Sequence, residues 1–214
     1  VTDLEGKLWK INMTTNGNLY EASQIFEAQS TADNDRYNYH RTTASITDDG
    51  RIIHVFGTGN KQRLSRIKSS IKNRLHAVID NDYPYYSTIM NPINAGSLYN
   101  SNLSSCPDTI SNGWYMNLGA NEKVTSEITI EDSILYTPVY TPDSKNLCSA
   151  GTSKLLESSL ICGNIIAETD LGLGIATKAT VYNGKVYIGV SDASSLPSGG
   201  ESDIKKKVNI LIKT

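Results

Sequence analysis

Three acidic clusters hold the side chains most suited to metal chemistry. They are the Asp-Asn-Asp runs at 33–35 and 80–82 and the adjacent pair Asp48-Asp49. Calcium takes six to eight oxygen ligands, and alternating carboxylates and amides supply such oxygens. However, none of the three clusters has the spacing and the closing acid of a complete calcium loop. Asp and Asn also build turns without a metal, so the clusters are interpreted as turns and no metal site is predicted.

The three histidines, His40, His54 and His76, each sit in or beside an expected strand. Acid–base catalysis requires a positioned nucleophile or proton partner beside such a group. The sequence contains neither a Gly-x-Ser-x-Gly elbow nor a His-Glu-x-x-His helix. The short glycine turns at 57–60 and 172–174 do not begin a phosphate-binding helix. We therefore predict no catalytic residue and no enzymatic activity.

The chain has three cysteines, Cys106, Cys148 and Cys162, and none of them has the spacing of a zinc site or a redox dithiol. They could be three buried thiols. Alternatively, one disulfide and one free thiol would form if the protein is exported to an oxidising compartment. Residue types and spacing leave both alternatives open.

A basic segment at 60–73 is the first candidate for binding. It contains five cationic residues and no acid: Lys61, Arg63, Arg66, Lys68 and Lys72. Apolar residues recur within and just after it at helix-like spacing: Leu64, Ile67, Ile71 and Leu75. This pattern predicts a short amphipathic helix. Its charged face either contacts an acidic partner or is simply solvated.

The second candidate is the stretch 83–112, which is rich in Tyr, Asn and Ser and contains three prolines. We expect a long exposed loop, and such loops often carry binding residues. The candidate binding residues of the two segments are Lys61, Arg63, Arg66, Tyr85 and Tyr86.

These residues must be positioned by a repeated strand–turn–strand unit. The unit occurs at 48–59 and 181–192 and more loosely at 131–142. Each copy has a tight turn followed by alternating apolar residues, and another alternating run precedes it. Repeated antiparallel sheets within one chain are typical of a propeller. The sequence therefore predicts an all-β fold, a partial β-propeller of about three four-stranded antiparallel blades with long loop insertions.

The expected blades follow from grouping the strands in chain order, with the outermost strand of each blade placed before the inner three. The groups are 7–13, 42–47, 51–57 and 74–80; 113–118, 124–130, 134–140 and 153–158; and 164–169, 175–182, 185–191 and 207–213. Trp9 and Trp114 would then occupy equivalent outer strands and pack between blades. Complete propellers need four or more blades. We therefore expect residues 1–214 to be the C-terminal part of a propeller domain in a longer chain.

Composition narrows the range of partners. The net charge of −2 and the isoelectric point of about 5.9 do not favour nucleic-acid binding. No window reaches the length of a membrane-spanning helix, so no membrane span is predicted.

Several segments resemble, in the same order, those of the PilY/PilC family of type IV pilus tip-associated adhesins and biogenesis factors. DLEGKLWKINM resembles the family's DLxGxLWKFDL segment, and GWYMNLGANEKVTSE is similar to its GWYLDL…GERV segment. Further similar segments are VFGTGN, RLHAVIDND, YTPDSKNLCSAGTSKLL and GLGIATKATVYNGKVYIGVSD. The resemblance spans Val1 to about Asp192, whereas 60–73 and 83–112 depart from the family pattern.

The resemblance implies the C-terminal propeller domain of an exported protein at the bacterial cell surface, at the pilus tip or outer membrane. It implies pilins or minor pilins as partners, and a host or abiotic surface as a ligand. The family's calcium loop would lie upstream of Val1, so no cofactor is expected in this chain. The CSAGTS context of Cys148 matches the family, which implies a disulfide from Cys148 to Cys106 or Cys162.

Two other classes of protein fit the blade pattern. A quinoprotein-like propeller enzyme would need a bound quinone with calcium, an Asp base and, in many members, two adjacent cysteines; this chain has no adjacent cysteines. A structural propeller that serves as a platform for protein assembly would need no site at all. Quinone absorbance would identify the enzyme, and co-purification with pilins would favour the pilus protein over a general platform.

Overall fold

The computed structural model describes residues 1–15, 17–86, 92–103, 106–107, 109–146 and 149–191, and the backbone of 209–213. These residues form strands joined by turns, with short 3₁₀ helices at Lys61–Arg63 (η1) and Ala95–Ser97 (η2). Within them, no helix has the length and apolar character needed to cross a membrane.

The described strands form four sheets. The first contains β1 (Lys7–Ile11), β2 (Ala22–Glu27) and β6 (Ile93–Asn94). The second contains β3 (Thr43–Ile46), β4 (Ile52–Gly57), β5 (Arg74–Asp80), β8 (Gly113–Asn117) and β7 (Tyr99–Asn100). The third contains β10 (Thr129–Glu131), β11 (Ile134–Thr141), β12 (Thr152–Ser159) and β13 (Ile165–Leu173), with β9 (Lys123–Val124) paired to β11. The fourth contains β14 (Thr180–Tyr182), β15 (Lys185–Val190) and β16 (Asn209–Lys213).

Two-residue turns fix the register of the later sheets. Asn183-Gly184 joins β14 to β15 with φ of 49° and 68°, and Asp132-Ser133 joins β10 to β11 with φ of 48° and 60°. Positive φ at both central residues defines the type I′ turn, whose twist matches that of paired strands. The turn at Asn183-Gly184 therefore aligns Tyr182 with Lys185.

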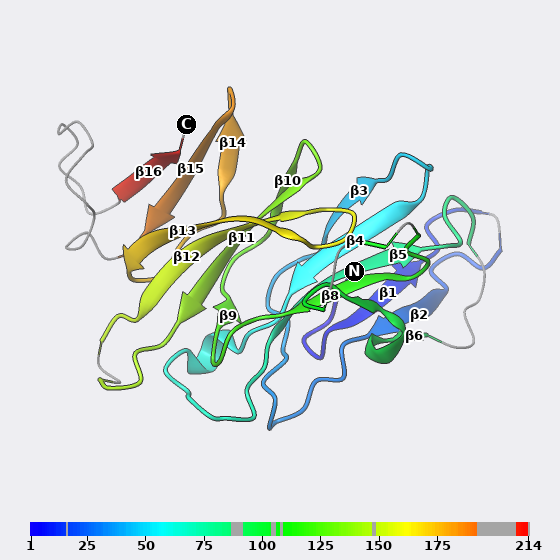
Figure 1. Ribbon diagram of the computed structural model, residues 1–214. Helices are drawn as coiled ribbons and strands as arrows, with labels where there is room; N and C mark the ends of the chain where they lie inside the picture. The colour runs from blue at the N-terminus through cyan, green and yellow to red at the C-terminus, as the bar shows by residue number, and fades with distance from the viewer. Residues whose placement is uncertain are drawn as a thin grey trace.

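The sheets follow one another across the molecule in chain order, from β1–β2 to β14–β16 (Figure 1). The second, third and fourth sheets are linked by a repeated hydrogen bond from an edge strand of one sheet to the residue before an edge strand of the next. Thr43, the first residue of β3, donates through Oγ1 to the carbonyl of Ile128, 2.7 Å away. Thr129, the first residue of β10, donates in the same way to Ala179 at 2.5 Å. This succession of sheets, built mainly from antiparallel strand pairs, confirms the prediction of an all-β partial propeller.

The expected grouping of strands into blades was wrong by one strand. The strand at Gly113–Asn117 closes the sheet of β3, β4 and β5, because it pairs antiparallel with β5 through Ala77 and Trp114. β13 likewise closes the third sheet by pairing with β12. In these two sheets the strand that pairs with the third long strand therefore follows the inner three in the chain instead of preceding them.

For this reason the two tryptophans are not equivalent. Trp114 lies on β8, between β5 and β7, is fully buried, and donates its indole N–H to the carbonyl of Leu160 at 2.9 Å. It packs against the third sheet, where a side chain on Gly163 would clash with the indole ring. Trp9 lies on β1 between β2 and the chain end at Val1, and its indole N–H bonds Asp3 at 2.9 Å.

The stretch 83–112 is not a free loop over its described residues. β6 pairs in parallel with β2, and β7 pairs in parallel with β8. Ala95 and Leu98 are buried in a core cluster with Phe26. The stretch therefore joins the first sheet to the second, which its polar composition did not indicate.

Candidate binding site

The basic segment 60–73 does not form the expected amphipathic helix. It contains a single 3₁₀ turn, in which the side chain of Asn60 accepts a hydrogen bond from the backbone N–H of Gln62. Ile71 is buried, but Ile67 is 36% exposed, so the apolar residues do not share one face. Beyond the turn, contacts with other loops replace helical hydrogen bonds. For example, the backbone N–H of Lys68 donates to Asn121.

The acidic partners of this segment come from the same chain. Arg66 forms an ion pair with Asp35 at 2.6 Å, and Lys68 forms one with Asp33 at 2.5 Å. Arg66 also donates to the carbonyl of Ala32 at 3.0 Å. The Asp-Asn-Asp turn at 33–35 thus binds two of the five cations, although no local pattern indicated that the two segments would meet.

Asp35 is the most unusual residue of this region. Its side chain is fully buried, and its backbone has φ of 55°, a left-handed conformation uncommon outside glycine. Its Oδ1 accepts hydrogen bonds from Arg66 and, at 3.2 Å, from Asn60. Its Oδ2 is buried and has no hydrogen-bond partner among the residues described. A buried carboxylate oxygen without a partner is costly, which makes this atom a candidate for ligand binding.

A second buried charge lies close by. Lys123 is fully buried, and its ammonium donates to the carbonyl of Arg66 at 2.9 Å. Burial lowers the pKa of Lys123, and the negative charge of Asp35 partly offsets this effect. The backbone of Gly59 passes against this side chain, where any Cβ would come within 2.7 Å. Buried charges of this kind are tolerated only where partners hold them in place.

A cavity of about 380 Å³ opens beside Asp35, and we call it the Asp35 cavity. Its lining includes Tyr37, Tyr39, Arg63 and Arg66. The hydroxyl of Tyr39 donates to Asn60 at 3.2 Å. Burial raises the pKa of Tyr39, the negative charge of Asp35 adds to the effect, and the positive charge of Arg63 opposes it. Tyrosine, carboxylate and guanidinium groups therefore converge on one space.

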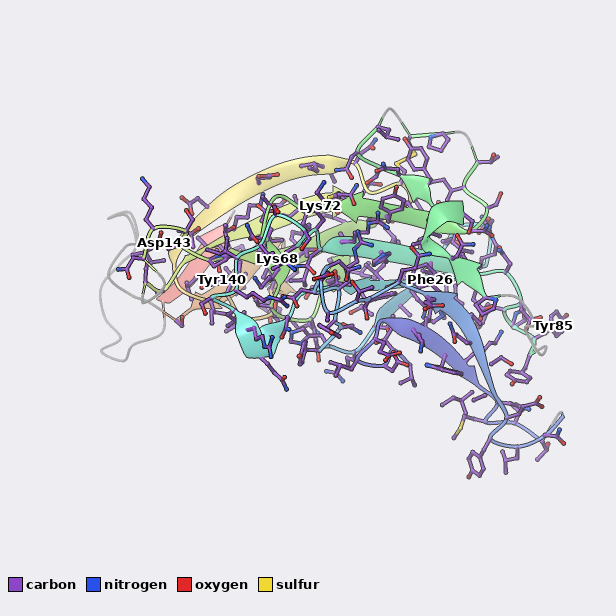
Figure 2. All side chains as sticks on the ribbon, turned by 90° about the horizontal axis from the view of Figure 1, so that it is seen from below. Phe26, Lys68, Lys72, Tyr85, Tyr140 and Asp143 are labelled. Atoms are coloured by element: carbon purple, nitrogen blue, oxygen red, sulfur yellow. A yellow bond between two sulfur atoms is a disulfide. The ribbon has the colours of Figure 1, made fainter. Side chains whose placement is uncertain are left out.

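The five candidate residues do not form one surface. Arg63 and Arg66 line the Asp35 cavity, whereas Lys61 is exposed on η1 outside its lining. Tyr85 lies at the far end of the molecule from the basic segment, as its separation from Lys68 shows (Figure 2). The Tyr85 side chain is 75% exposed, and the Tyr86 hydroxyl lies 3.1 Å from Ser23 Oγ.

The second Asp-Asn-Asp turn, at 80–82, binds a cation from within the chain. The ammonium of Lys10 lies 2.9 Å from Asp80 Oδ2 and 3.1 Å from Asp82 Oδ2. It also donates to the carbonyl of Tyr85 at 2.6 Å. Lys10 thus occupies the position that a metal would need between these oxygens. Across the described residues, no group of three or more His, Cys, Asp or Glu side chains is arranged to hold a metal ion.

A disulfide joins Cys106 to Cys162, with Cα atoms 5.6 Å apart. The family resemblance implied that Cys148 would pair with one of these two cysteines, but in the structure they bond to each other. Cys148 itself lies outside the described residues. The bond ties the segment before β8 to the turn between β12 and β13, and so fastens the second sheet to the third.

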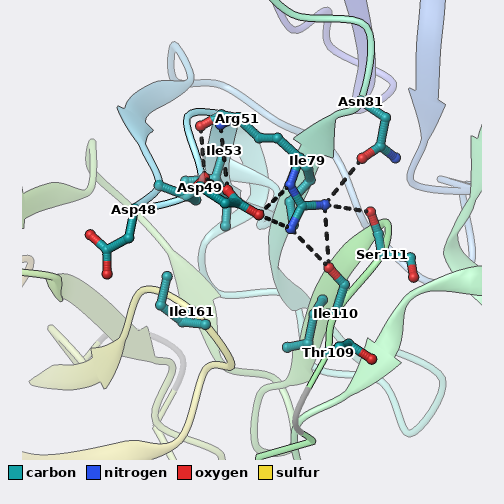
Figure 3. A pocket seen from close by; sticks show the side chains of 11 residues that line it. Asp48, Asp49, Arg51, Ile53, Ile79, Asn81, Thr109, Ile110, Ser111 and Ile161 are labelled. Carbon is teal, nitrogen blue, oxygen red and sulfur yellow. Dashed lines mark hydrogen bonds and ion pairs between the residues drawn. The ribbon is translucent and has the colours of Figure 1, made fainter.

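A larger cavity of about 560 Å³ is lined by Ile161, the residue before Cys162 of the disulfide (Figure 3). Ile53, Ile79 and Ile161 form its apolar part, and Arg51 crosses it to bond Asp49 at 2.6 Å and the carbonyl of Ser111 at 3.3 Å. Hydrogen bonds from Arg51 and Thr47 lower the pKa of Asp49 to about 2. The polar groups drawn around this cavity thus bond mainly to one another.

The histidines occupy structural positions. His76 is fully buried and stacks on Phe56 with ring centroids 5.1 Å apart. Burial lowers its pKa well below the ordinary value, with the charges of Arg74 and Arg36 adding to the effect. Burial also lowers the pKa of His54 to about 4 and lowers that of His40. These rings are therefore neutral at neutral pH.

A comparison with solved structures finds a similar fold. The structure is similar to the crystal structure of the PilY1 C-terminal domain of Pseudomonas aeruginosa, with a TM-score of 0.60 and 14% sequence identity. The chain has a PilY1-like fold. The match covers 88% of this chain and 55% of the PilY1 chain, so this chain spans about half of that domain's length. No protein-family model and no curated protein sequence matches it.

Within this PilY1-like fold, sequence reasoning found Arg63 and Arg66 but missed Asp35, Lys123 and Lys10. The repeated Asp-Asn-Asp tripeptide was the signal available for the two aspartate sites. The interpretation as turns was incomplete, because the same residues also bind cations contributed by other segments.

Proposed function

We propose that this chain is the C-terminal propeller part of a type IV pilus-associated protein that acts in pilus biogenesis and surface adhesion. The PilY1-like fold is the observation that carries this proposal. Pilins or minor pilins are the proposed partners on the pilus side, and a host or abiotic surface is the proposed ligand. The proposed location is the bacterial cell surface, at the pilus tip or outer membrane, after export.

In this proposal the propeller acts by binding, without a catalytic step and without a cofactor held by this chain. Folds of this kind supply a rigid scaffold, and loops at the ends of the strands supply the contacts. Two exposed regions are suited to this role. One is the mouth of the Asp35 cavity with Arg63, and the other is Tyr85.

The test is a strain that produces the protein without residues 1–214. We expect fewer surface pili and weaker attachment to an abiotic surface than in the parent strain. Unchanged piliation and attachment would overturn the pilus role. A smaller change is the substitution Tyr85→Ala. It removes an exposed ring but keeps the backbone carbonyl that binds Lys10, so we expect the fold to be kept.

Tyr85→Ala is preferable to deleting the surrounding stretch. Residues 92–103 include β6 and β7, which pair with two different sheets, so their removal would damage the fold. We expect Tyr85→Ala to reduce co-purification of pilins while leaving the melting temperature unchanged. Equal recovery of pilins with both proteins would exclude Tyr85 from the contact.

A further inference from the structure

We propose that the Asp35 cavity binds an acidic saccharide, a ligand that presents both a hydroxyl group and a carboxylate, such as a hexuronate unit. This inference rests on the proposed function, because it names a ligand class through which the propeller would contact a surface. Its two requirements, a hydrogen-bond donor and an anion, come from separate features of the cavity.

The donor is required by Asp35. An ionised carboxylate only accepts hydrogen bonds. Arg66 and Asn60 occupy Oδ1, whereas Oδ2 is buried without a partner among the described residues, and Asp35 is one of the residues that line the cavity. A ligand hydroxyl would satisfy this oxygen. A ligand without a donor hydrogen would instead place its own lone pairs against a buried negative charge.

The anion is favoured by the charges around the cavity. Arg66 already compensates Asp35, and buried Lys123 lies close to both. Arg63 is exposed at the cavity and forms no ion pair with any carboxylate among the described residues. A guanidinium binds a carboxylate through two parallel hydrogen bonds, so Arg63 is suited to hold the acid group of a ligand. The same surplus of positive charge disfavours an amine as the donor for Asp35.

The cavity is also suited to a sugar in size and shape. Its volume of about 380 Å³ falls in the range of small-molecule sites. Tyr37 and Tyr39 supply aromatic rings with polar tips, which suit a ring that has both apolar and hydroxyl-bearing faces. Asn60 is held in place by bonds to Asp35, Tyr39 and Gln62, so the cavity wall is pre-organised.

This combination predicts a selectivity that neither requirement gives alone. A neutral saccharide has donors for Asp35 but no anion for Arg63. Sulfate has the charge but no hydrogen to donate to Asp35. A uronate oligosaccharide has both, so it should bind more tightly than either.

The experiment is calorimetric titration of the intact protein with trigalacturonate, neutral galactotriose and sodium sulfate. We expect trigalacturonate to bind about tenfold or more tightly than the other two probes, because it alone makes the charge-assisted pair. We also expect its affinity to fall as sodium chloride is raised, because the pair is close to solvent. Equal affinity for the acidic and neutral trisaccharides, or no binding of trigalacturonate, would overturn the proposal.

Arg63→Gln and Lys72→Gln form a matched pair of variants. Each removes one positive charge from an exposed position of the same segment, but only Arg63 lines the cavity. We expect Arg63→Gln to weaken trigalacturonate binding by about tenfold and Lys72→Gln to leave it within about twofold. Equal weakening by both would mean that net charge alone attracts the ligand, which would also overturn the site. Piliation is measured separately, so failure here leaves the pilus role intact.

Discussion

The tripeptide Asp-Asn-Asp occurs twice in this chain, and its two copies lie at opposite ends of the β4–β5 pair. At the end of β5, Asp80 and Asp82 converge on the single ammonium of Lys10. At the other end, Asp33 and Asp35 bind different cations, and one oxygen of Asp35 has no partner among the described residues and belongs to a residue that lines a cavity. The tripeptide is the same in both places, and the cations that bind it differ. We call the 80–82 site closed, because one ammonium binds both carboxylates, and the 33–35 site open, because the two carboxylates bind different cations.

The surroundings of the two sites strengthen this contrast. The closed end adjoins the larger cavity, which Asn81 and Ile161 line, and the residue after Ile161 is Cys162 of the disulfide that joins neighbouring sheets. The open end is built from the basic segment 60–73, whose regular structure is a single 3₁₀ turn. The comparison therefore predicts that substitutions at the closed end cost stability and that substitutions at the open end change mainly binding.

The largest effect is expected from removing the disulfide. Its cysteines are 56 residues apart. A crosslink of that span lowers the conformational entropy of the unfolded chain, which raises the free energy of unfolding by about 4 kcal/mol. The double variant Cys106→Ser with Cys162→Ser should lose about that free energy of unfolding in urea titrations. A loss below about 1 kcal/mol would show that packing around Trp114 fastens these sheets without the bond.

Lys10 is expected to be the next most important. Lys10→Met leaves the carboxylate of Asp80, which is 4% exposed, without its cation. Removing one partner of a buried ion pair costs about 3 kcal/mol or more in the free energy of unfolding. Lys7→Met is the control on the same strand, because Lys7 pairs with an exposed Glu5 and its loss should change the free energy of unfolding much less. Similar losses for the two variants would contradict the closed character of the 80–82 site.

Acidification should weaken the same end of the molecule through His54. Burial lowers the pKa of His54 to about 4, although the nearby charge of Asp80 opposes the shift. Below about pH 6.5 the unfolded chain binds a proton that the folded chain does not, so stability falls as the pH drops towards 4. The decrease in the free energy of unfolding due to His54 approaches about 3 kcal/mol near pH 4 and disappears above about pH 6.5.

Urea titrations of the parent and of His54→Gln at pH 7 and pH 4.5 check this expectation. His40 and His76 also have lowered pKa values, so both proteins should lose stability on acidification. The variant should lose less. Equal losses in the two proteins would mean that His54 is accessible to protons in the folded state.

The sequence predicted the hairpins well, because each is encoded locally. Asn183-Gly184 sets a type I′ turn whatever lies around it. The outer strands were misassigned because the pairing of β8 with β5 joins residues about 37 positions apart, and no local pattern encodes such a pairing. The stretch that contains β6 and β7 was missed for the same reason, since strands of two residues leave little periodicity.

The sequence was sufficient to predict the cationic residues of the candidate site, Arg63 and Arg66, but not its carboxylate, Asp35. Arg63 and Arg66 stand out as a run of basic residues, but an Asp-Asn-Asp turn is typical of surface loops. Only the folded chain shows that Asp35 is buried and that Asn60 and Arg66 meet its Oδ1. The amphipathic helix was predicted wrongly because Ile67 and Ile71 have helix-like spacing without lying on a helix. Ile71 is buried, whereas Ile67 is exposed.

The smallest effect on stability is expected at the open end. Arg66→Met removes the cation that contacts Asp35, but Asn60 still donates to that carboxylate and buried Lys123 remains nearby. Because Arg66 is itself 26% exposed, the free energy of unfolding should fall by about 1–2 kcal/mol, less than for Lys10→Met. Lys68→Met, which breaks an exposed pair with Asp33, should change the free energy of unfolding least of the three. Urea titrations of the three variants rank the sites directly. If Arg66→Met cost as much as Lys10→Met, the two Asp-Asn-Asp turns would be equally closed, and the unpaired oxygen of Asp35 would no longer distinguish them.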